Sequence, residues 1–106
     1  MDAEALKGHL DLLLLATLEA RPAHGYAIAE RLRHRSGGTF DLPEGTLYPA
    51  LHRLEDAGLL SSRWSSASGR RRRVYQVTAR GQRRLDAKHD DWRQFAQAVH
   101  AVVGAR

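Results

Sequence analysis

The chain has 106 residues, of which 42% are hydrophobic and 27% charged, and this composition predicts a single globular domain. It contains no cysteine, which excludes a disulfide framework, a thiol nucleophile and a cysteine-based zinc site. The net charge of +5 comes from one segment of the chain. Residues 63–84 contain eight arginines and no acidic residue, whereas the rest of the chain contains nine Lys and Arg against 12 Asp and Glu.

Two helices are expected in the first third of the chain. Apolar residues that recur on one helical face predict a first helix over residues 3–20, which ends at Arg21 and Pro22. A second helix is expected over residues 24–35, before a Ser-Gly-Gly segment that suits a helix end. The apolar stripe of this second helix is expected to contain Tyr26, Ile28, Ala29 and Leu32.

A third helix is expected within residues 43–57, where leucines follow one another at i, i+4 and i+7, and Gly58 ends it. Its start depends on Pro49. If the helix begins near Thr46, Pro49 lies in the first turn, where its missing N–H is harmless. If the helix begins at Pro43, a kink is expected ahead of Pro49.

Two short strands follow, over residues 59–64 and 72–78, joined by a Ser- and Gly-rich turn. Thr78 then suits the N-cap of a final helix over residues 79–103. Three helices followed by a hairpin are the order of a winged helix-turn-helix. The sequence therefore predicts a mainly α fold with a small β-hairpin, divided into a DNA-binding domain over residues 1–78 and a C-terminal dimerisation helix over residues 79–106.

The arginine-rich segment falls on the tip and second strand of this expected hairpin. Arginine pairs bidentately with phosphate and keeps its charge at ordinary pH. Basic runs also occur in solvated tails and at membrane surfaces, but a dense cationic patch on a winged helix favours nucleic-acid binding.

The final helix carries a heptad-like apolar seam, interrupted once by Lys88. The residues of the seam are Leu85, Trp92, Phe95, Val99 and Val102. A helix of this length spans roughly 37 Å at 1.5 Å per residue, which is longer than a domain of this size can cover. We therefore expect the stripe to pack against a second copy of the chain.

Three segments resemble the PadR family of bacterial transcriptional regulators. They are His24-Gly25-Tyr26, the run GTLYPALHRLEDAGLL from Gly45 to Leu60, and the wing from Ser61 to Gly81, which reads SSRW…GRRRRVYQVTARG. The resemblance implies a homodimeric winged-helix repressor of a two-fold symmetric operator, with the third helix as recognition helix. It also implies a dimer formed through the last helix and the first, to which Leu6 and Leu10 would contribute.

The residues expected to contact DNA lie on the third helix and the wing. A recognition helix reads the major groove through its N-terminal half, and its outer face carries Thr46, Tyr48, Pro49, His52 and Arg53. The alternatives are that Tyr48 packs under the wing and that His52 is merely exposed. The wing residues, expected to reach phosphates or the minor groove, are Arg63, Gly69, Arg70, Arg71, Arg72 and Arg73.

Trp92 and Phe95 are candidates for a ligand site. The resemblance implies that a tryptophan at this place in the last helix of drug-sensing relatives stacks on flat aromatic ligands between subunits, and that a small aromatic effector relieves repression. The alternative is that both side chains only fill the dimer seam. The other tryptophan, Trp64, is expected to pack the wing onto the helical body.

Other classes of function fit the sequence less well. The sequence contains neither a phosphate-binding glycine loop nor a Ser/His/Asp or Cys/His arrangement, so an enzyme is not expected. The six histidines show no metal-ligand spacing, and neither a metal nor a cofactor is expected. The apolar run 12–18 is too short to cross a bilayer, and acidic residues near the start disfavour a signal peptide, so we expect a soluble cytoplasmic protein. The main alternative is a non-specific architectural DNA- or RNA-binding protein.

Overall fold

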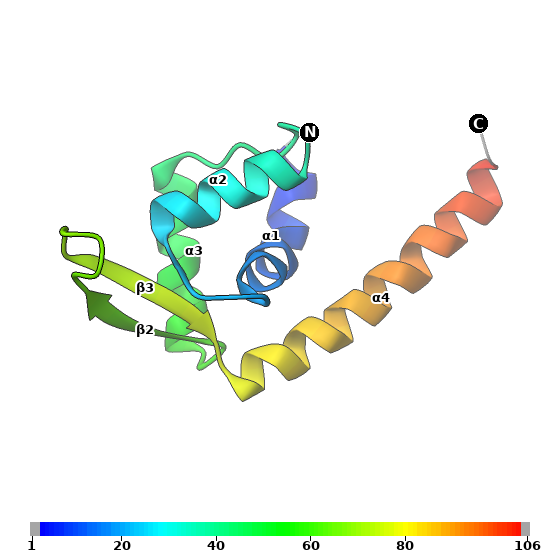
Figure 1. Cartoon of the computed structure of the whole chain (residues 1–106). Helices are drawn as coiled ribbons and strands as arrows, with labels where there is room; N and C mark the ends of the chain where they lie inside the picture. The colour runs from blue at the N-terminus through cyan, green and yellow to red at the C-terminus, as the bar shows by residue number, and fades with distance from the viewer. Residues whose placement is uncertain (1–2, 105–106) are drawn as a thin grey trace.

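The computed structural model describes the backbone of residues 3–104 and the side chains of residues 9–104. Four helices and three short strands follow one another in the expected order, with one strand more than expected (Figure 1). The elements are α1 (Ala3–Leu18), β1 (Ala23–His24), α2 (Gly25–Arg35), α3 (Glu44–Asp56), β2 (Leu60–Ser65), β3 (Arg72–Val77) and α4 (Ala79–Val103). The predicted helices and the hairpin are confirmed to within two residues.

The three strands form one antiparallel sheet in the order β1-β3-β2. Strand β1 was not expected from the sequence. It has two residues, Ala23 and His24, which lie opposite Tyr75 and Val74 of β3. This pairing ties the start of α2 to the wing, because α2 begins at the residue that follows β1.

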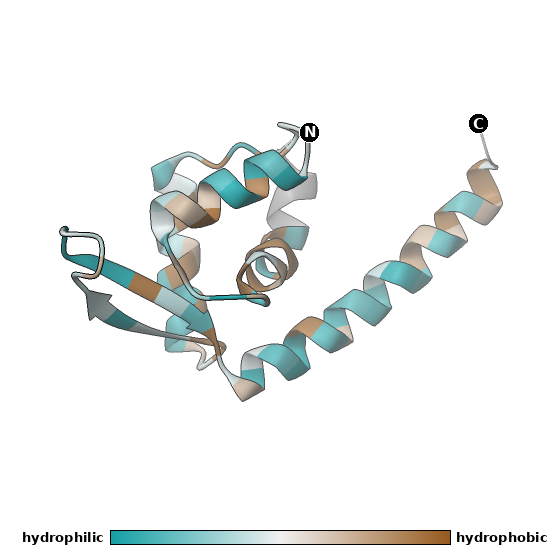
Figure 2. Ribbon diagram, viewed as in Figure 1, coloured by the Kyte–Doolittle hydropathy of each residue, from teal (hydrophilic) through white to brown (hydrophobic). Residues whose placement is uncertain are grey.

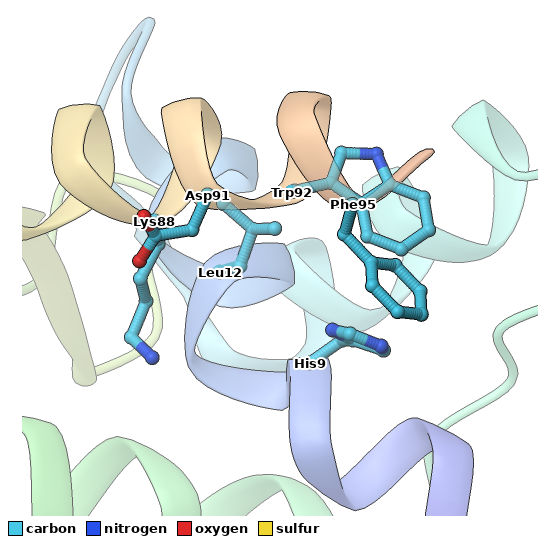
Figure 3. Close-up of a pocket in the computed structure, with 6 residues that line it drawn as sticks. All are labelled: His9, Leu12, Lys88, Asp91, Trp92 and Phe95. Carbon is cyan, nitrogen blue, oxygen red and sulfur yellow. The ribbon is translucent and has the colours of Figure 1, made fainter. Parts of the chain in front are cut away.

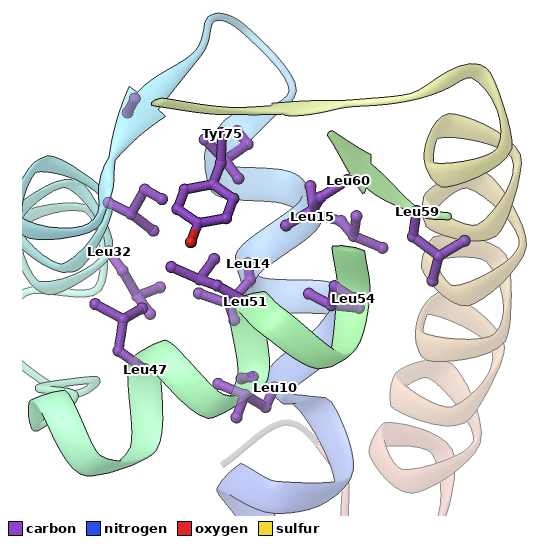
Figure 4. Close-up of a cluster of buried hydrophobic side chains, with 14 of the residues drawn as sticks. Leu10, Leu14, Leu15, Leu32, Leu47, Leu51, Leu54, Leu59, Leu60 and Tyr75 are labelled. Atoms are coloured by element: carbon purple, nitrogen blue, oxygen red, sulfur yellow. The ribbon is translucent and has the colours of Figure 1, made fainter. Parts of the chain in front are cut away.

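The core lies where α1, α2 and α3 meet the base of the sheet. Twelve leucines and the ring of Tyr75 are among the buried side chains, and Figure 4 shows that ring pointing from β3 toward Leu14 and Leu51. Full burial of a leucine stabilises a fold by about 1.5–3 kcal/mol. The buried hydroxyl of Thr17 donates a hydrogen bond to the carbonyl oxygen of Leu13 at 2.6 Å. The three-helix body is thus held by a continuous apolar cluster.

Helix α3 begins at Glu44, with Pro43 as its N-cap residue, so the earlier of the two expected starts is the observed one. The backbone N–H groups of Thr46 and Leu47 both donate to the carbonyl of Pro43, which fixes the first turn. Pro49 therefore lies inside the helix, where it cannot donate the usual bond to the carbonyl four residues earlier.

Helix α4 is anchored at its N-terminal end and projects from the body beyond it (Figure 1). Thr78 is its N-cap, as expected, and the Thr78 hydroxyl accepts a hydrogen bond from the N–H of Gly81 at 3.0 Å. Leu85 is buried in the core. Further along, apolar residues recur on the helix as far as its distal end (Figure 2). Within residues 3–104, no helix is both long and apolar enough to cross a membrane.

Candidate nucleic-acid interface

A hollow of about 560 Å³ lies where the wing faces the N-terminal ends of α2 and α3. Both helix ends carry the positive pole of their backbone dipoles, which favours anions. From the wing, Arg70 to Arg73 and Trp64 line the hollow. From β1 and the helices, the lining residues are His24, Tyr26, Glu44 and Tyr48. The fold thus gathers cationic side chains and helix N-termini on one surface.

The exposed face of α3 carries the residues expected to read DNA, but it does not present them equally. Pro49 and His52 are exposed and Thr46 is half-buried. Tyr48 is half-buried with its ring against α2, where a Cβ added to Gly25 would come within 2.7 Å of three ring and hydroxyl atoms. A side chain at position 25 would therefore displace Tyr48, and packing explains this ring at least as well as DNA contact.

Arg53 lies nearer the C-terminal end of α3 and faces α1. Its guanidinium forms an ion pair with Asp11 at 2.8 Å, although the Arg53 side chain stays 57% exposed. An exposed ion pair of this kind contributes little to stability, so the arginine can exchange its carboxylate partner for a phosphate at small cost.

The four consecutive arginines of the wing differ in their partners. Arg70 and Arg71 are exposed, and among the described residues no acidic side chain pairs with either. A nitrogen of the Arg72 guanidinium lies 2.6 Å from Nε2 of His24. Arg73 donates to the Ser62 hydroxyl at 2.7 Å and lies 3.6 Å from the Glu55 carboxylate. Among the four, Arg73 alone thus has an acidic partner in the described part of the chain, whereas Arg70 and Arg71 make neither a hydrogen bond nor an ion pair there.

Two more wing residues lie where expected. Arg63 is exposed on β2, opposite Val74 of β3. Gly69 has a φ of +81° in the turn at the wing tip, a conformation that side chains other than glycine rarely adopt, and its N–H donates to the carbonyl of Ser66 at 2.9 Å.

The expectation for Trp64 is wrong. Its side chain is 53% exposed and does not pack onto the helical body. Instead, the guanidinium carbons of Arg71 and Arg73 lie 4.6 Å and 5.4 Å from the centre of its ring. The alternation of side chains along β2 puts Trp64 on the face of Ser62, opposite Arg73, beyond the point where the core ends.

His24 opens one of the segments that resemble the PadR family, but it was not among the residues expected to contact DNA. Its Nδ1 accepts the N–H of Ala27 at 3.4 Å and so caps α2, while its Nε2 faces Arg72. Burial lowers the pKa of His24, and the positive charges of Arg72 and Arg31 lower it further. The neutral imidazole is the form that this arrangement favours.

Tyr26 was expected in the apolar stripe of α2, and this expectation is wrong. Its side chain is 69% exposed at the edge of the cationic hollow. The reason is geometric, because Tyr26 and the buried Ile28 are two residues apart and so lie roughly 200° apart around a helix. The two-residue spacing between Tyr26 and Ile28 was the signal that could have placed Tyr26 on the surface.

A second hollow, of about 270 Å³, lies between α1 and α4 (Figure 3). Trp92 and Phe95 of α4 face His9 and Leu12 of α1, and the rings of His9 and Trp92 meet edge to face at 5.1 Å. Lys88 and Asp91 complete the lining. The hollow thus combines two aromatic rings with one carboxylate and one ammonium group.

The residues expected at a dimer seam divide into two groups. Leu10 and Leu85 are only 7% and 4% exposed in the core of the chain itself, so neither is free to contact a second copy, and we remove both from the seam. The side chain of Leu6 lies outside the described residues. The other four expected seam residues are exposed on α4, namely Trp92, Phe95, Val99 and Val102.

A three-helix body followed by a hairpin with an arginine-rich tip is the architecture of a winged-helix DNA-binding protein. Residues 14–87 match the family described as the transcriptional regulator PadR-like family. A transcriptional regulator from Mycobacterium tuberculosis is 36% identical over 83 residues, which cover 78% of this chain and 72% of that protein. The chain therefore belongs to the PadR-like family, whose members are DNA-binding transcriptional regulators and not enzymes.

Solved structures agree with this assignment. A PadR family transcription regulator from Clostridium difficile R20291 superposes with a TM-score of 0.81 at 35% identity, covering 92% of this chain and 100% of that one. A PadR family regulator from Eggerthella lenta superposes with a TM-score of 0.82 at 31% identity, covering 97% of this chain and 88% of that one. The predicted winged-helix fold class is thereby confirmed.

Proposed function

We propose that the protein is a homodimeric repressor that binds a two-fold symmetric operator. The observation that carries this proposal is the exposed apolar face of α4, on which Phe95 and Val102 are 59% and 87% exposed. Soluble monomers rarely leave such a face uncovered. A second copy of the same helix would cover it through a self-complementary, two-fold symmetric contact. As a DNA-binding regulator, the dimer would act in the cytoplasm.

Two-fold pairing would give the assembly two copies of α3 and two wings. Each α3 would enter a major groove with Thr46 and His52 toward the base edges, and half-sites would lie about 34–36 Å apart, one turn of DNA. Arg70 and Arg71 would meet phosphates or the adjacent minor groove. Binding across a promoter would then block transcription.

We further propose that a planar aromatic molecule relieves repression by binding at Trp92 and Phe95. The hollow beside them pairs aromatic faces with the carboxylate of Asp91, a combination that suits a flat cation. In a Trp64→Phe variant, Trp92 is the only tryptophan of the chain, so quenching of its fluorescence by planar cationic dyes tests the site. Quenching that also releases DNA would support the effector role, and dyes without effect on either signal would contradict it.

The experiment that tests the repressor proposal is selection of duplexes from a random-sequence pool, with gel shifts of the enriched duplex at two salt concentrations. We expect enrichment of a sequence with two-fold symmetry, a complex with two chains per duplex, and persistence of that complex against excess random competitor. A chain that enriched nothing, and bound all duplexes alike, would be the non-specific architectural protein of the alternative.

A further inference from the structure

The wing exposes a tryptophan whose ring is covered by arginines. The guanidinium of Arg71 lies 4.6 Å from the ring centre of Trp64, and that of Arg73 lies 5.4 Å from it. Both distances are within the range at which the ring quadrupole attracts a cation. The contact therefore joins the exposed indole to two of the four consecutive arginines of the wing.

The two arginines differ in what else holds them. Arg73 lies directly opposite Trp64 in the β2–β3 ladder, and the Ser62 hydroxyl and the Glu55 carboxylate also anchor its side chain. Arg71 precedes β3, and in the described part of the chain no hydrogen bond or ion pair involves its side chain. The ring of Trp64 is thus the feature that restrains Arg71.

A restrained arginine is a better phosphate ligand than a mobile one. A long side chain loses rotamer freedom when it binds, and this loss opposes binding. If the guanidinium is already held in place, less freedom is lost. Arg71 also keeps its full charge, because the ring, unlike a carboxylate, does not neutralise it.

We propose that Trp64 is a positioning residue of the DNA interface, whose ring holds the Arg71 guanidinium beside the hollow before a phosphate arrives. Trp64 would act through Arg71 and would make no base contact of its own. The inference rests on the proposed function for its setting, and concerns the strength of the wing contact with the DNA backbone.

A double-mutant cycle tests the coupling. Wild type, Trp64→Leu, Arg71→Gln and the double variant are titrated against a fluorescein-labelled duplex of random sequence at low salt, with fluorescence anisotropy as the readout. We expect Trp64→Leu to weaken binding about two- to fivefold, the range that a cation–π contact at an exposed site corresponds to. In the Arg71→Gln background, the same substitution should have no further effect. Trp64→Tyr, which keeps an aromatic face, should retain most of the affinity.

Equal losses on Trp64→Leu in both backgrounds would overturn the inference, because Trp64 would then act independently of Arg71. A random duplex is the suitable probe because phosphate contacts do not depend on base sequence. A chain without any preferred operator would still give a result, so failure of the repressor proposal and failure of this inference are distinguishable. Circular dichroism checks that each variant is folded.

A second measurement uses the native indole. In a Trp92→Phe variant, Trp64 is the only tryptophan of the chain. Adding Arg71→Gln should change the emission of Trp64, because a cation leaves its ring. Adding Arg70→Gln instead is the matched control, since no contact joins Arg70 to the ring among the described side chains, and the emission should stay unchanged. If neither substitution changed the emission of Trp64, the contact between Arg71 and Trp64 would be refuted.

Discussion

The wing and the distal part of α4 are both exposed, but they differ in whether their exposed side chains find favourable partners in the chain itself or in water. In the wing, Arg72 faces His24, Arg73 faces Glu55 and Ser62, and water can solvate the remaining cations. On α4, the side chains of Phe95 and Val102 are largely exposed, and water does not satisfy an apolar surface. The cationic surface can therefore exist without its ligand, whereas the apolar face indicates a protein partner.

The joint between these two regions is where the largest effect on stability is expected. A Cβ at Gly81 would overlap the carbonyl oxygen of Leu59, and backbone cannot easily yield. Gly81→Ala should lower the free energy of unfolding by about 3 kcal/mol through over-packing. Chemical denaturation with circular dichroism measures the change.

Gly45→Ala is the matched control, because a Cβ at Gly45, in the first turn of α3, would meet no atom within 4 Å. This change should be neutral or stabilising by up to about 1 kcal/mol. Equal losses in the two variants would mean that the close approach of α4 to Leu59 is not what makes Gly81 necessary.

The apolar face of α4 offers the next largest effect. Phe95→Asp should weaken self-association about 30-fold, roughly 2 kcal/mol, because two charged groups would enter the proposed seam. The chain should stay folded, since Phe95 is 59% exposed. Analytical ultracentrifugation over a range of concentrations measures the dissociation constant.

Gln97→Asp introduces the same charge on the opposite, exposed side of α4, because Gln97 and Phe95 are two residues and so roughly 200° apart around the helix, and it should leave the association unchanged. A dimer insensitive to Phe95→Asp, or one that both variants weaken alike, would remove this face from the interface.

The wing arginines should contribute to the salt dependence of the DNA-binding constant. Replacing Arg70 and Arg71 by Gln should reduce the slope of log K against log salt by about 0.9 for each phosphate that these arginines neutralise in the wild type. Arg33→Gln is the control, because Arg33 lies in the last turn of α2 and pairs with Glu30 at 3.0 Å. An unchanged slope in the double variant would exclude the wing tip from the interface.

The smallest effect concerns His24 and pH. Burial and the neighbouring cations lower the pKa of this imidazole in the folded chain, so the unfolded chain binds the proton more readily. The free energy of unfolding should therefore fall as the pH drops below about 6.5, the ordinary value for histidine, and should be constant in this respect above it. His24→Asn keeps a capping side chain that does not titrate. Urea unfolding near pH 5.5 and near pH 7.5 should show a smaller difference for the variant; an equal difference would assign the pH dependence to another group.

Local patterns in the sequence were sufficient for most of the fold. The leucines at positions 47, 51 and 54 are all buried, and Thr78 caps α4 as its position before the apolar pattern indicated. Strand β1 could not be found in this way, because two residues carry no periodicity. It forms only because β3 offers it a partner edge.

The partners of the charged residues in the candidate site were beyond the reach of such patterns. The sequence located the arginine cluster, but the contact between Arg72 and His24 joins residues 48 positions apart. Likewise, an indole can pack inward or lie beside guanidinium groups. For Trp64 the outcome depends on how far the core extends along β2, and the core ends before this residue. Pattern reasoning located the cations of the wing, and tertiary packing determined which of them are neutralised.

The hydrogen bonds of Thr78 would couple the position of each wing to the arrangement of the two subunits in a dimer. The N–H of Thr78 donates to the carbonyl of Leu59, its hydroxyl donates to the carbonyl of Gly58, and the same hydroxyl accepts the N–H of Gly81. These bonds hold Thr78, the one residue between β3 and α4, against the segment that precedes β2 and against the first turn of α4. In a dimer, each wing would therefore move together with its own α4 helix. A change in the angle at which two paired α4 helices cross would then alter the distance between the two wing tips.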